Sequence, residues 1–342
     1  MDERLLNVFG TFQVTEEYVM CKHYFNFVPL AAVLLAASGA VMAGHDDSPA
    51  LAVAPFDEQQ ARQHQEAWAE HLGQPVEVTN SVGMKLRLIP PGEFMMGSPE
   101  SEKERVENEG PQHRVRITRP FYLGVYEVTQ EEYEQVMGTN PSYFSCSDDA
   151  SGCVAGEDTG RFPVERVTWA DAVEFCRRLS AMPAERSAGR HYRLPTEAEW
   201  EYSCRAGTTT PFHFGSVLDG RQANCDGNRP YGTSAKGPYL ERPTVVGSYS
   251  ANAFGLYDMH GNVWEWCSDW YDSNYYATSP VDDPPGSASA LLRVFRGGLR
   301  VFRGGGWYFD AGGCRSAFRG TCGPGRLDFS LGFRVALVPV DE

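Results

Sequence analysis

A single cysteine stands among glycines and arginines near the end of the chain, in the segment RVFRGGGWYFDAGGCRSAFRG at residues 300–320. A thiolate is a nucleophile and a soft ligand that selects Cu(I), so Cys314 could take part in redox or metal chemistry. A buried thiol that packs as a small apolar side chain is the alternative. The sequence therefore raises the question of whether Cys314 has a chemical partner.

A second segment, YDMHGNVWEW at residues 257–266, carries hard oxygen ligands. The carboxylates of Asp258 and Glu265 flank a glycine-containing turn, and Ca²⁺ takes about six to eight oxygen ligands. These residues could therefore form a calcium site. In the alternative interpretation the segment is an aromatic turn, in which Glu265 pairs with an arginine.

Other chemical patterns are missing from the sequence or have a structural explanation. The acids of EAEWEY at residues 197–202 are accounted for by helix capping rather than by glycosidase chemistry. His260 is a lone imidazole, which is more often a satisfied loop residue than a base. No Ser-His-Asp pattern, phosphate loop or nucleotide fingerprint occurs. The net charge of −15 argues against nucleic acid as a partner.

The N-terminal segment MCKHYFNFVPLAAVLLAASGAVMAG at residues 20–44 has a basic start and an apolar run that ends in small residues. It predicts a signal peptide over residues 1–43, with Met20 as a candidate true start and cleavage after Ala43. An uncleaved membrane anchor is the alternative. We expect a periplasmic or secreted monomer with no membrane segment after cleavage. Its eight remaining cysteines permit disulfides, and Cys146 with Cys153 is the best local pair.

Several elements can be placed before any fold is assigned. Residues 44–79 indicate a linker and a helical arm, and residues 80–98 and 113–129 indicate strand pairs around turns. Capping boxes predict three short helices, which begin at Thr129 with Glu132, Thr168 with Asp171 and Thr196 with Glu199. With 35 Gly and 22 Pro, the rest is expected to be loop. The predicted class is α+β, with a single compact loop-rich domain over residues 80–340.

A tandem repeat interrupts the C-terminal part of the chain. RVFRGGL at residues 293–299 is followed directly by RVFRGGG at residues 300–306. A repeat this short cannot build a solenoid. We expect one copy to pair as a strand and the other to bulge out, and a duplication or sequence error is the alternative.

Five segments, in order, resemble the formylglycine-generating enzyme family, also called sulfatase-modifying factors. They are IPPGEFMMGS, YEVTQEEYEQVM, YRLPTEAEWEYSCRAG, GLYDMHGNVWEWCSDWY and RVFRGGGW…CRSAFR…LGFRVA. The resemblance spans residues 80–340 and implies a fold related to C-type lectins. It also implies an oxidase that binds copper through two cysteines and uses O₂ to convert a sulfatase cysteine to an aldehyde.

The copper pair of that family follows a Gly-Gly-Ser-Trp/Tyr signature. When positions are counted from Gly304, the first cysteine position is held by Phe309 and the second falls on Cys314. A phenyl ring cannot bind copper, so the resemblance predicts a structural role for Cys314. A divergent copper site formed by Cys314 and Cys322 is the alternative.

The resemblance also carries calcium ligands onto this chain. In one site Asp258 and Glu265 would bind by their side chains and Gly261 and Val263 by their carbonyls. A second site would use the side chain of Asn224 and the carbonyl of Cys225, but its other half does not align.

These observations favour an exported, divergent or non-catalytic family member that acts by binding a sulfatase or another protein or peptide. The first alternative is an active copper-dependent oxidase that makes formylglycine. The second is a lectin-like ligand-binding protein of the kind diversified by retroelements. The places that would vary in that kind of protein are Tyr308, Phe309, Asp310, Gly312, Gly313, Gly320, Thr321 and Asp328.

Overall fold

A computed structural model describes residues 48–145, 154, 156–287 and 298–338. The predicted signal peptide, Cys146, Cys153 and residues 293–297 of the first repeat copy lie outside the described residues. Among the helices of the described part, none is both long and apolar enough to cross a membrane.

Antiparallel pairing builds a five-stranded sheet in the order β2-β3-β6-β12-β7. Its strands are β2 (Glu77–Thr79), β3 (Lys85–Ile89), β6 (Phe121–Gly124), β7 (His191–Arg193) and β12 (Ala336–Val338). Strand β12 lies between β6 and β7, so the last described strand is held in the interior of this sheet.

Two smaller sheets carry the remaining strands. The four-stranded sheet, in the order β10-β9-β8-β11, contains β8 (Trp264–Trp270), β9 (Arg300–Arg303), β10 (Gly320–Cys322) and β11 (Leu331–Gly332). The three-stranded sheet contains β1 (Ala52–Val53), β4 (Gly92–Met96) and β5 (His113–Ile117). The second repeat copy thus supplies β9, as expected for one of the two copies.

The three helices predicted from capping boxes are confirmed. They are α2 (Gln130–Met137), α3 (Trp169–Ala181) and α5 (Glu197–Arg205), and each begins with the reciprocal cap between hydroxyl and acid. The other helical elements are α1 (Glu58–His71), α4 (Pro183–Ser187), η1 (Glu107–Glu109), η3 (Tyr275–Ala277) and η5 (Ala311–Cys314). Short helices and strands joined by long loops confirm the α+β, loop-rich class.

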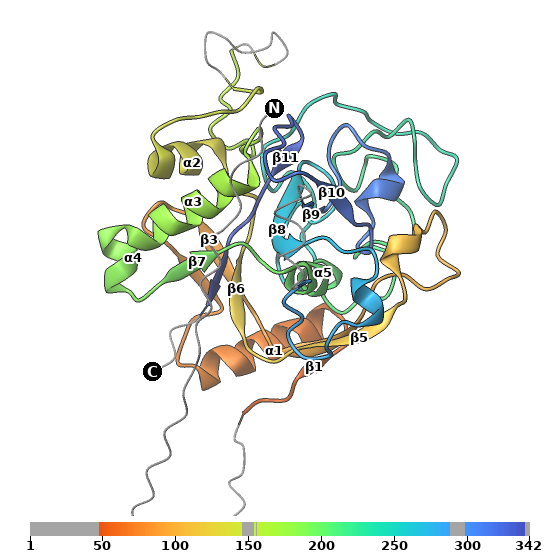
Figure 1. The fold of residues 1–342 in the computed structure, drawn as a ribbon, viewed down its shortest axis with the longest axis horizontal. Helices are drawn as coiled ribbons and strands as arrows, with labels where there is room; N and C mark the ends of the chain where they lie inside the picture. Colours follow the sequence, from red (N-terminus) through yellow and green to blue (C-terminus); the bar gives the residue numbers. More distant parts are fainter. Residues whose placement is uncertain (1–47, 146–153, 155, 288–297, 339–342) are drawn as a thin grey trace, which may run out of the picture. The chain divides into compact units, whose positions relative to one another are not determined.

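Figure 1 shows how the helices lie against the sheets. Helix α3 packs on β7, while α5 contacts β4, β5, β8 and β9 and so lies between the two smaller sheets. The arm helix α1 docks on the domain through Gln65, whose buried amide donates to the carbonyls of Leu88 and Phe254. Trp200 of α5 and Trp266 of β8 are fully buried, and they belong to two different apolar clusters of the core.

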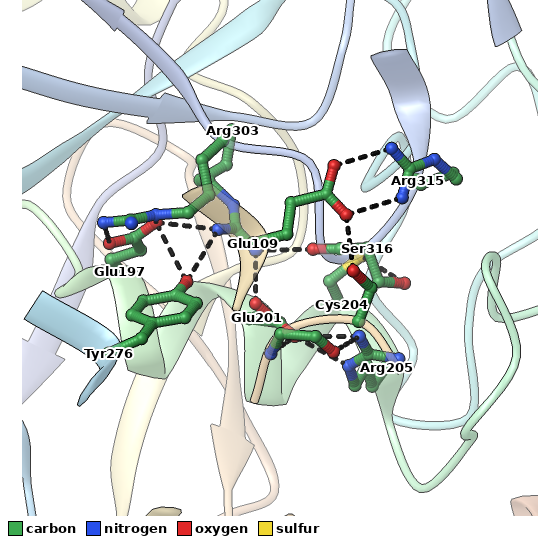
Figure 2. Close-up of polar contacts among 12 residues, drawn as sticks. Glu109, Glu197, Glu201, Cys204, Arg205, Tyr276, Arg303, Arg315 and Ser316 are labelled. Carbon is green, nitrogen blue, oxygen red and sulfur yellow. Dashed lines mark hydrogen bonds and ion pairs between the residues drawn. The ribbon is translucent and has the colours of Figure 1, made fainter. Parts of the chain in front are cut away.

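A buried ionic network attaches the segment after β9 to α5 and to the loop around η1 (Figure 2). Arg303 binds Glu197 and Glu201 of α5, and Arg319 makes a two-pronged pair with Glu197 at 2.6 and 2.8 Å. Arg315 pairs in the same way with Glu109, at 2.7 and 2.8 Å. Burial acts to raise the pKa of Glu201, yet Arg205 and Arg303 hold that pKa below its usual value. Glu201 is therefore ionised and needs its two arginines.

Removing one member of this network should destabilise the protein strongly. We expect Arg303→Ala to lower the free energy of unfolding by about 3–5 kcal/mol, because it leaves buried carboxylates without a counter-charge. Arg177→Ala, which breaks an exposed pair with Glu174, is the control and should cost less than about 1 kcal/mol. Urea unfolding followed by tryptophan fluorescence measures both, and equal losses would contradict the role given to Arg303.

Candidate functional site

A glycine-rich bend connects β9 to the segment that contains Cys314. Gly305 has a φ of +79°, and a Cβ built on it would lie 2.3 Å from the Cys314 sulfur. Glycine is therefore required here both for its conformation and for the space that the thiol needs. After the bend, the Trp307 amide donates to the Asn262 carbonyl at 2.8 Å, which directs the next residues toward the surface.

Cys314 is fully buried at the end of η5. Its thiol lies 3.7 Å from the Asp310 carbonyl oxygen, and its own carbonyl accepts a 2.7 Å hydrogen bond from His260. The neighbouring Cys225 thiol and burial both raise the pKa of Cys314 well above its ordinary value. Cys314 is therefore a protonated thiol next to a second thiol, which sequence spacing did not indicate.

The position expected for a first copper sulfur is a surface ring. Phe309 is 38% exposed, and its ring meets Trp264 edge-on at a centroid distance of 5.1 Å. Cys322, the other partner considered for Cys314, lies on β10 and packs against a different apolar cluster from the one that contains Cys314. The structure thus pairs Cys314 with Cys225 rather than with a thiol at position 309 or 322.

Four exposed rings form a continuous patch, here called the aromatic surface, made of Tyr143, Tyr308, Phe309 and Phe329. Phe329 links the patch, because its ring lies 6.3 Å from Tyr143 and 6.1 Å from Tyr308. Trp307 lies beneath it and donates its indole N–H to the Phe329 carbonyl at 3.2 Å. The aromatic surface is therefore supported from below by a buried side chain.

Only some of the positions expected to vary face the solvent in this way. Tyr308 and Phe309 belong to the aromatic surface, whereas Gly312, Gly313 and Gly320 are buried. Asp310 caps η5 by accepting from the Gly313 amide, and Asp328 accepts from the Ser330 amide and hydroxyl. Thr321 is part of β10. Tyr143 and Phe329 were missed, since no spacing in the sequence connects them to residue 308.

The predicted calcium loop holds its carboxylates in different environments. Both oxygens of Glu265 accept from Arg334 at 2.6 Å, and one of them also accepts from the Trp200 indole at 2.8 Å. Asp258 lies under Gly247 and accepts from its amide at 2.6 Å. This geometry matches the alternative interpretation for Glu265, in which an arginine takes its charge.

A third acid, Glu127, lies beside this loop and was not singled out from the sequence. Its two oxygens accept from the side-chain amide of Asn262 at 2.7 Å and from the Val263 amide at 3.0 Å. Burial and then the Asp258 charge raise the pKa of Glu127 well above its ordinary value. Burial likewise raises the pKa of Asp258, to about 6. Three buried acids therefore face one arginine.

The fit of this region to Ca²⁺ is partial. The surplus of buried acid suits a divalent cation, and the buried Asn224 side-chain oxygen has no hydrogen-bond partner. Glu265, however, is already engaged by Arg334. Within the described ranges, no group of three or more His, Cys, Asp or Glu residues is arranged to hold a metal. Gly261 and Val263 remain on the same loop, and Gly261 packs directly against the Asn224 carbonyl.

His260 has the structural role that the sequence favoured. Besides its bond to the Cys314 carbonyl, it accepts from the His213 amide at 3.1 Å. Burial, and then the neighbouring His213, lower the pKa of His260 well below its ordinary value. The ring is thus neutral, with both nitrogens engaged, and does not act as a base.

A known protein family matches most of this chain. The family profile of the sulfatase-modifying factor enzyme 1-like domain matches residues 73–338. A formylglycine-generating enzyme of Streptomyces coelicolor is 33% identical over 291 residues, covering 72% of this chain and 87% of that protein. The serine/threonine-protein kinase pkn1 of Chlamydia caviae is 32% identical over 261 residues, and the match covers 72% of this chain but only 36% of the kinase.

Two solved structures are similar in fold to most of this chain. PvdO from Pseudomonas aeruginosa aligns with a TM-score of 0.61 and 28% identity, covering 77% of this chain and 98% of that one. Treponema denticola variable protein 1 aligns with a TM-score of 0.60 and 28% identity, covering 78% and 100%.

The bend at Gly305 offers a test of how tightly this region is packed. We expect Gly305→Ala to lower the free energy of unfolding by at least about 2 kcal/mol. An alanine there must adopt a left-handed backbone conformation, and its methyl group would overlap with the Cys314 sulfur. Gly323→Ala is the matched control, since nothing lies within 4 Å of its added methyl group. Thermal and urea unfolding measure the stability of both variants relative to the wild-type protein. If Gly305→Ala is as stable as the wild type, the bend can adjust to the added methyl group.

Proposed function

The chain belongs to the sulfatase-modifying factor family, and from this premise we propose that it acts by binding a protein or peptide on its aromatic surface rather than by copper-dependent oxidation. The observation that carries the proposal is the exposed ring of Phe309 at the place where the family resemblance requires a copper-binding sulfur.

Oxidase chemistry lacks support on two counts. Copper requires a thiolate, and the environment of Cys314 keeps its thiol protonated and away from solvent. A substrate cysteine must also reach the metal, whereas Cys314 is fully buried in an apolar cluster. An active copper oxidase therefore remains the weaker alternative.

Binding is supported by the chemistry of the exposed rings. Tyrosine and phenylalanine offer large contact areas and lose little conformational freedom on binding. Trp264 and Trp307 hold these rings from beneath, so the surface is ordered before a partner arrives. We propose an extended segment of an exported sulfatase as the partner, and a periplasmic or secreted location for the complex.

A peptide that contains the cysteine modified in sulfatases tests binding and chemistry together. With Cu(I) and O₂ present, we expect no oxygen uptake and no aldehyde, because Phe309 stands at the first copper position and the Cys314 thiol is fully buried. Binding of the fluorescent peptide should still be measurable by anisotropy. Turnover that is lost in Cys314→Ser would instead establish the oxidase.

The same peptide locates the contact. Tyr308→Ala should weaken binding by roughly tenfold or more, as expected when a central aromatic contact is removed. Met95→Ala, an exposed apolar residue on β4, is the control and should leave the affinity unchanged. If the wild-type protein, Tyr308→Ala and Met95→Ala bind the peptide with equal affinity, the proposed surface is wrong. If the wild-type protein does not bind the peptide, the proposed partner is wrong.

The second candidate is a lectin-like protein with a diversified binding surface. It is favoured by Tyr308 and Phe309, which occupy expected variable positions and are exposed, and by the likeness to a Treponema denticola protein named as variable. A near-copy of the DNA for residues 300–334 beside a reverse-transcriptase gene would support this candidate over the sulfatase partner.

We also propose that Ca²⁺ supports the fold at the Asp258 loop. Asp258 and Glu127 would supply carboxylates, Gly261 and Val263 carbonyls, and Asn224 its unpartnered oxygen near Cys225. Calcium would neutralise charge there without taking part in a reaction. Glu265 is left to Arg334 in this arrangement.

Millimolar Ca²⁺ should therefore raise the melting temperature by roughly 5 °C relative to EDTA, since ligand binding favours the folded state. Asp258→Ala should abolish the response because it removes a ligand oxygen and its charge, whereas Glu66→Ala on the exposed face of α1 should retain it. If the melting temperature of the wild-type protein is the same in Ca²⁺ and in EDTA, no calcium is bound and the buried acids are neutralised by protons instead.

A further inference from the structure

Two cysteines that the sequence places far apart meet in one small apolar cluster. Cys225 and Cys314 are 1% and 0% exposed, and they share this cluster with Phe212, Leu218, Ala223, Tyr231 and Ala311. Both are free thiols in the structure, and the Cys225 thiol is near enough to raise the pKa of Cys314. The sequence suggested a calcium-binding carbonyl for one of them and a separate structural role for the other.

The backbones around the two cysteines are joined independently of the sulfur atoms. Asp226 pairs with Asp310 in a parallel bridge, and the Asp226 amide donates to the Phe309 carbonyl at 2.8 Å. The Ala311 amide donates to the Arg229 carbonyl at 3.1 Å. The residue after Cys225 and the start of η5, which ends at Cys314, are therefore held together, so the fold brings the two cysteines into one cluster.

Side chains reinforce this pairing. Arg229 binds Asp226 at 2.8 Å and donates to the Tyr308 carbonyl at 3.2 Å. Gly305 leaves open the space that the Cys314 sulfur fills. Each of these contacts acts on a segment that carries one of the two cysteines, which limits how far the thiols can separate.

We propose that Cys225 and Cys314 form a disulfide when the protein folds in the presence of a dithiol–disulfide oxidant. One thiolate attacks the oxidant's disulfide and forms a mixed disulfide, releasing one oxidant thiol. The second cysteine then attacks the protein sulfur of that mixed disulfide and displaces the remaining oxidant thiol. Two protons and two electrons leave the cysteine pair, and the oxidant disulfide is reduced to two thiols.

A disulfide suits this cluster better than a metal bridged by the same sulfur atoms. A Cu(I) ion between two thiolates would leave a net negative charge among apolar side chains, where charge is costly. A disulfide carries no charge. It would also tie the segment at residues 224–229 to the segment that carries Tyr308 and Phe309, and so fix the base of the aromatic surface.

Peptide mapping of the full chain tests the linkage directly. The reduced, denatured protein is refolded in a glutathione buffer, free thiols are blocked, and a non-reducing digest is examined by mass spectrometry. We expect a peptide pair joined through Cys225 and Cys314, lighter by two hydrogen atoms than the sum of its reduced halves. Because the closed loop is long, reduction should lower the melting temperature by roughly 5–10 °C.

Variants separate this linkage from other thiol chemistry. The loss of melting temperature on reduction should disappear in Cys225→Ser but persist in Cys176→Ser, which changes a buried cysteine of α3. The wild-type digest decides the question even if a variant fails to fold. Blocked, unlinked Cys225 and Cys314 after refolding, linkage of either to another cysteine, or one Cu(I) bound by the pair under anaerobic titration would each overturn the proposal.

Discussion

Buried pairing of arginine with glutamate is the interaction on which the C-terminal half of this domain depends. Arg303, Arg315 and Arg319 have little or no contact with water, and each is held by a carboxylate from α5 or η1. A buried charge without its partner is far more costly than an ordinary lost contact. Such pairs therefore help to fix the position of the segment from residue 303 to residue 319. The bend at Gly305, the exposed rings of Tyr308 and Phe309, and Cys314 all lie on this segment.

The same arginines explain why the site is at the surface and the cysteines are not. Arg303 and Arg315 draw both ends of residues 303–315 inward, so Cys314 is buried with Cys225. Between the two arginines Phe309 packs edge-on against Trp264 and Tyr308 against Trp307, and both rings remain exposed. The family fold supplies the scaffold, and the residues of this segment place two aromatic rings at the surface and Cys314 in the interior.

Charge balance around β8 shows why a ligand set is difficult to infer from spacing alone. Asp258 and Glu265 have the separation and chemistry of calcium ligands, yet Arg334 comes from far along the chain to bind Glu265. Glu127 comes from the opposite direction and joins Asp258. The charged partner of each acid is a side chain that is distant in the sequence and that the fold places beside it. The local sequence therefore does not predict that partner.

Local sequence determined the elements whose causes are themselves local. Hydroxyl and acid residues three positions apart specified the starts of α2, α3 and α5, and five ordered segments specified the family and the α+β, loop-rich class. Only the tertiary structure decided the contacts between distant residues: Cys225 with Cys314, Arg334 with Glu265, and Phe329 with Tyr308. The physical reason is range. A helix cap is satisfied within one turn of the chain, whereas a buried thiol, charge or ring takes its partner from whatever the packing of loops brings beside it.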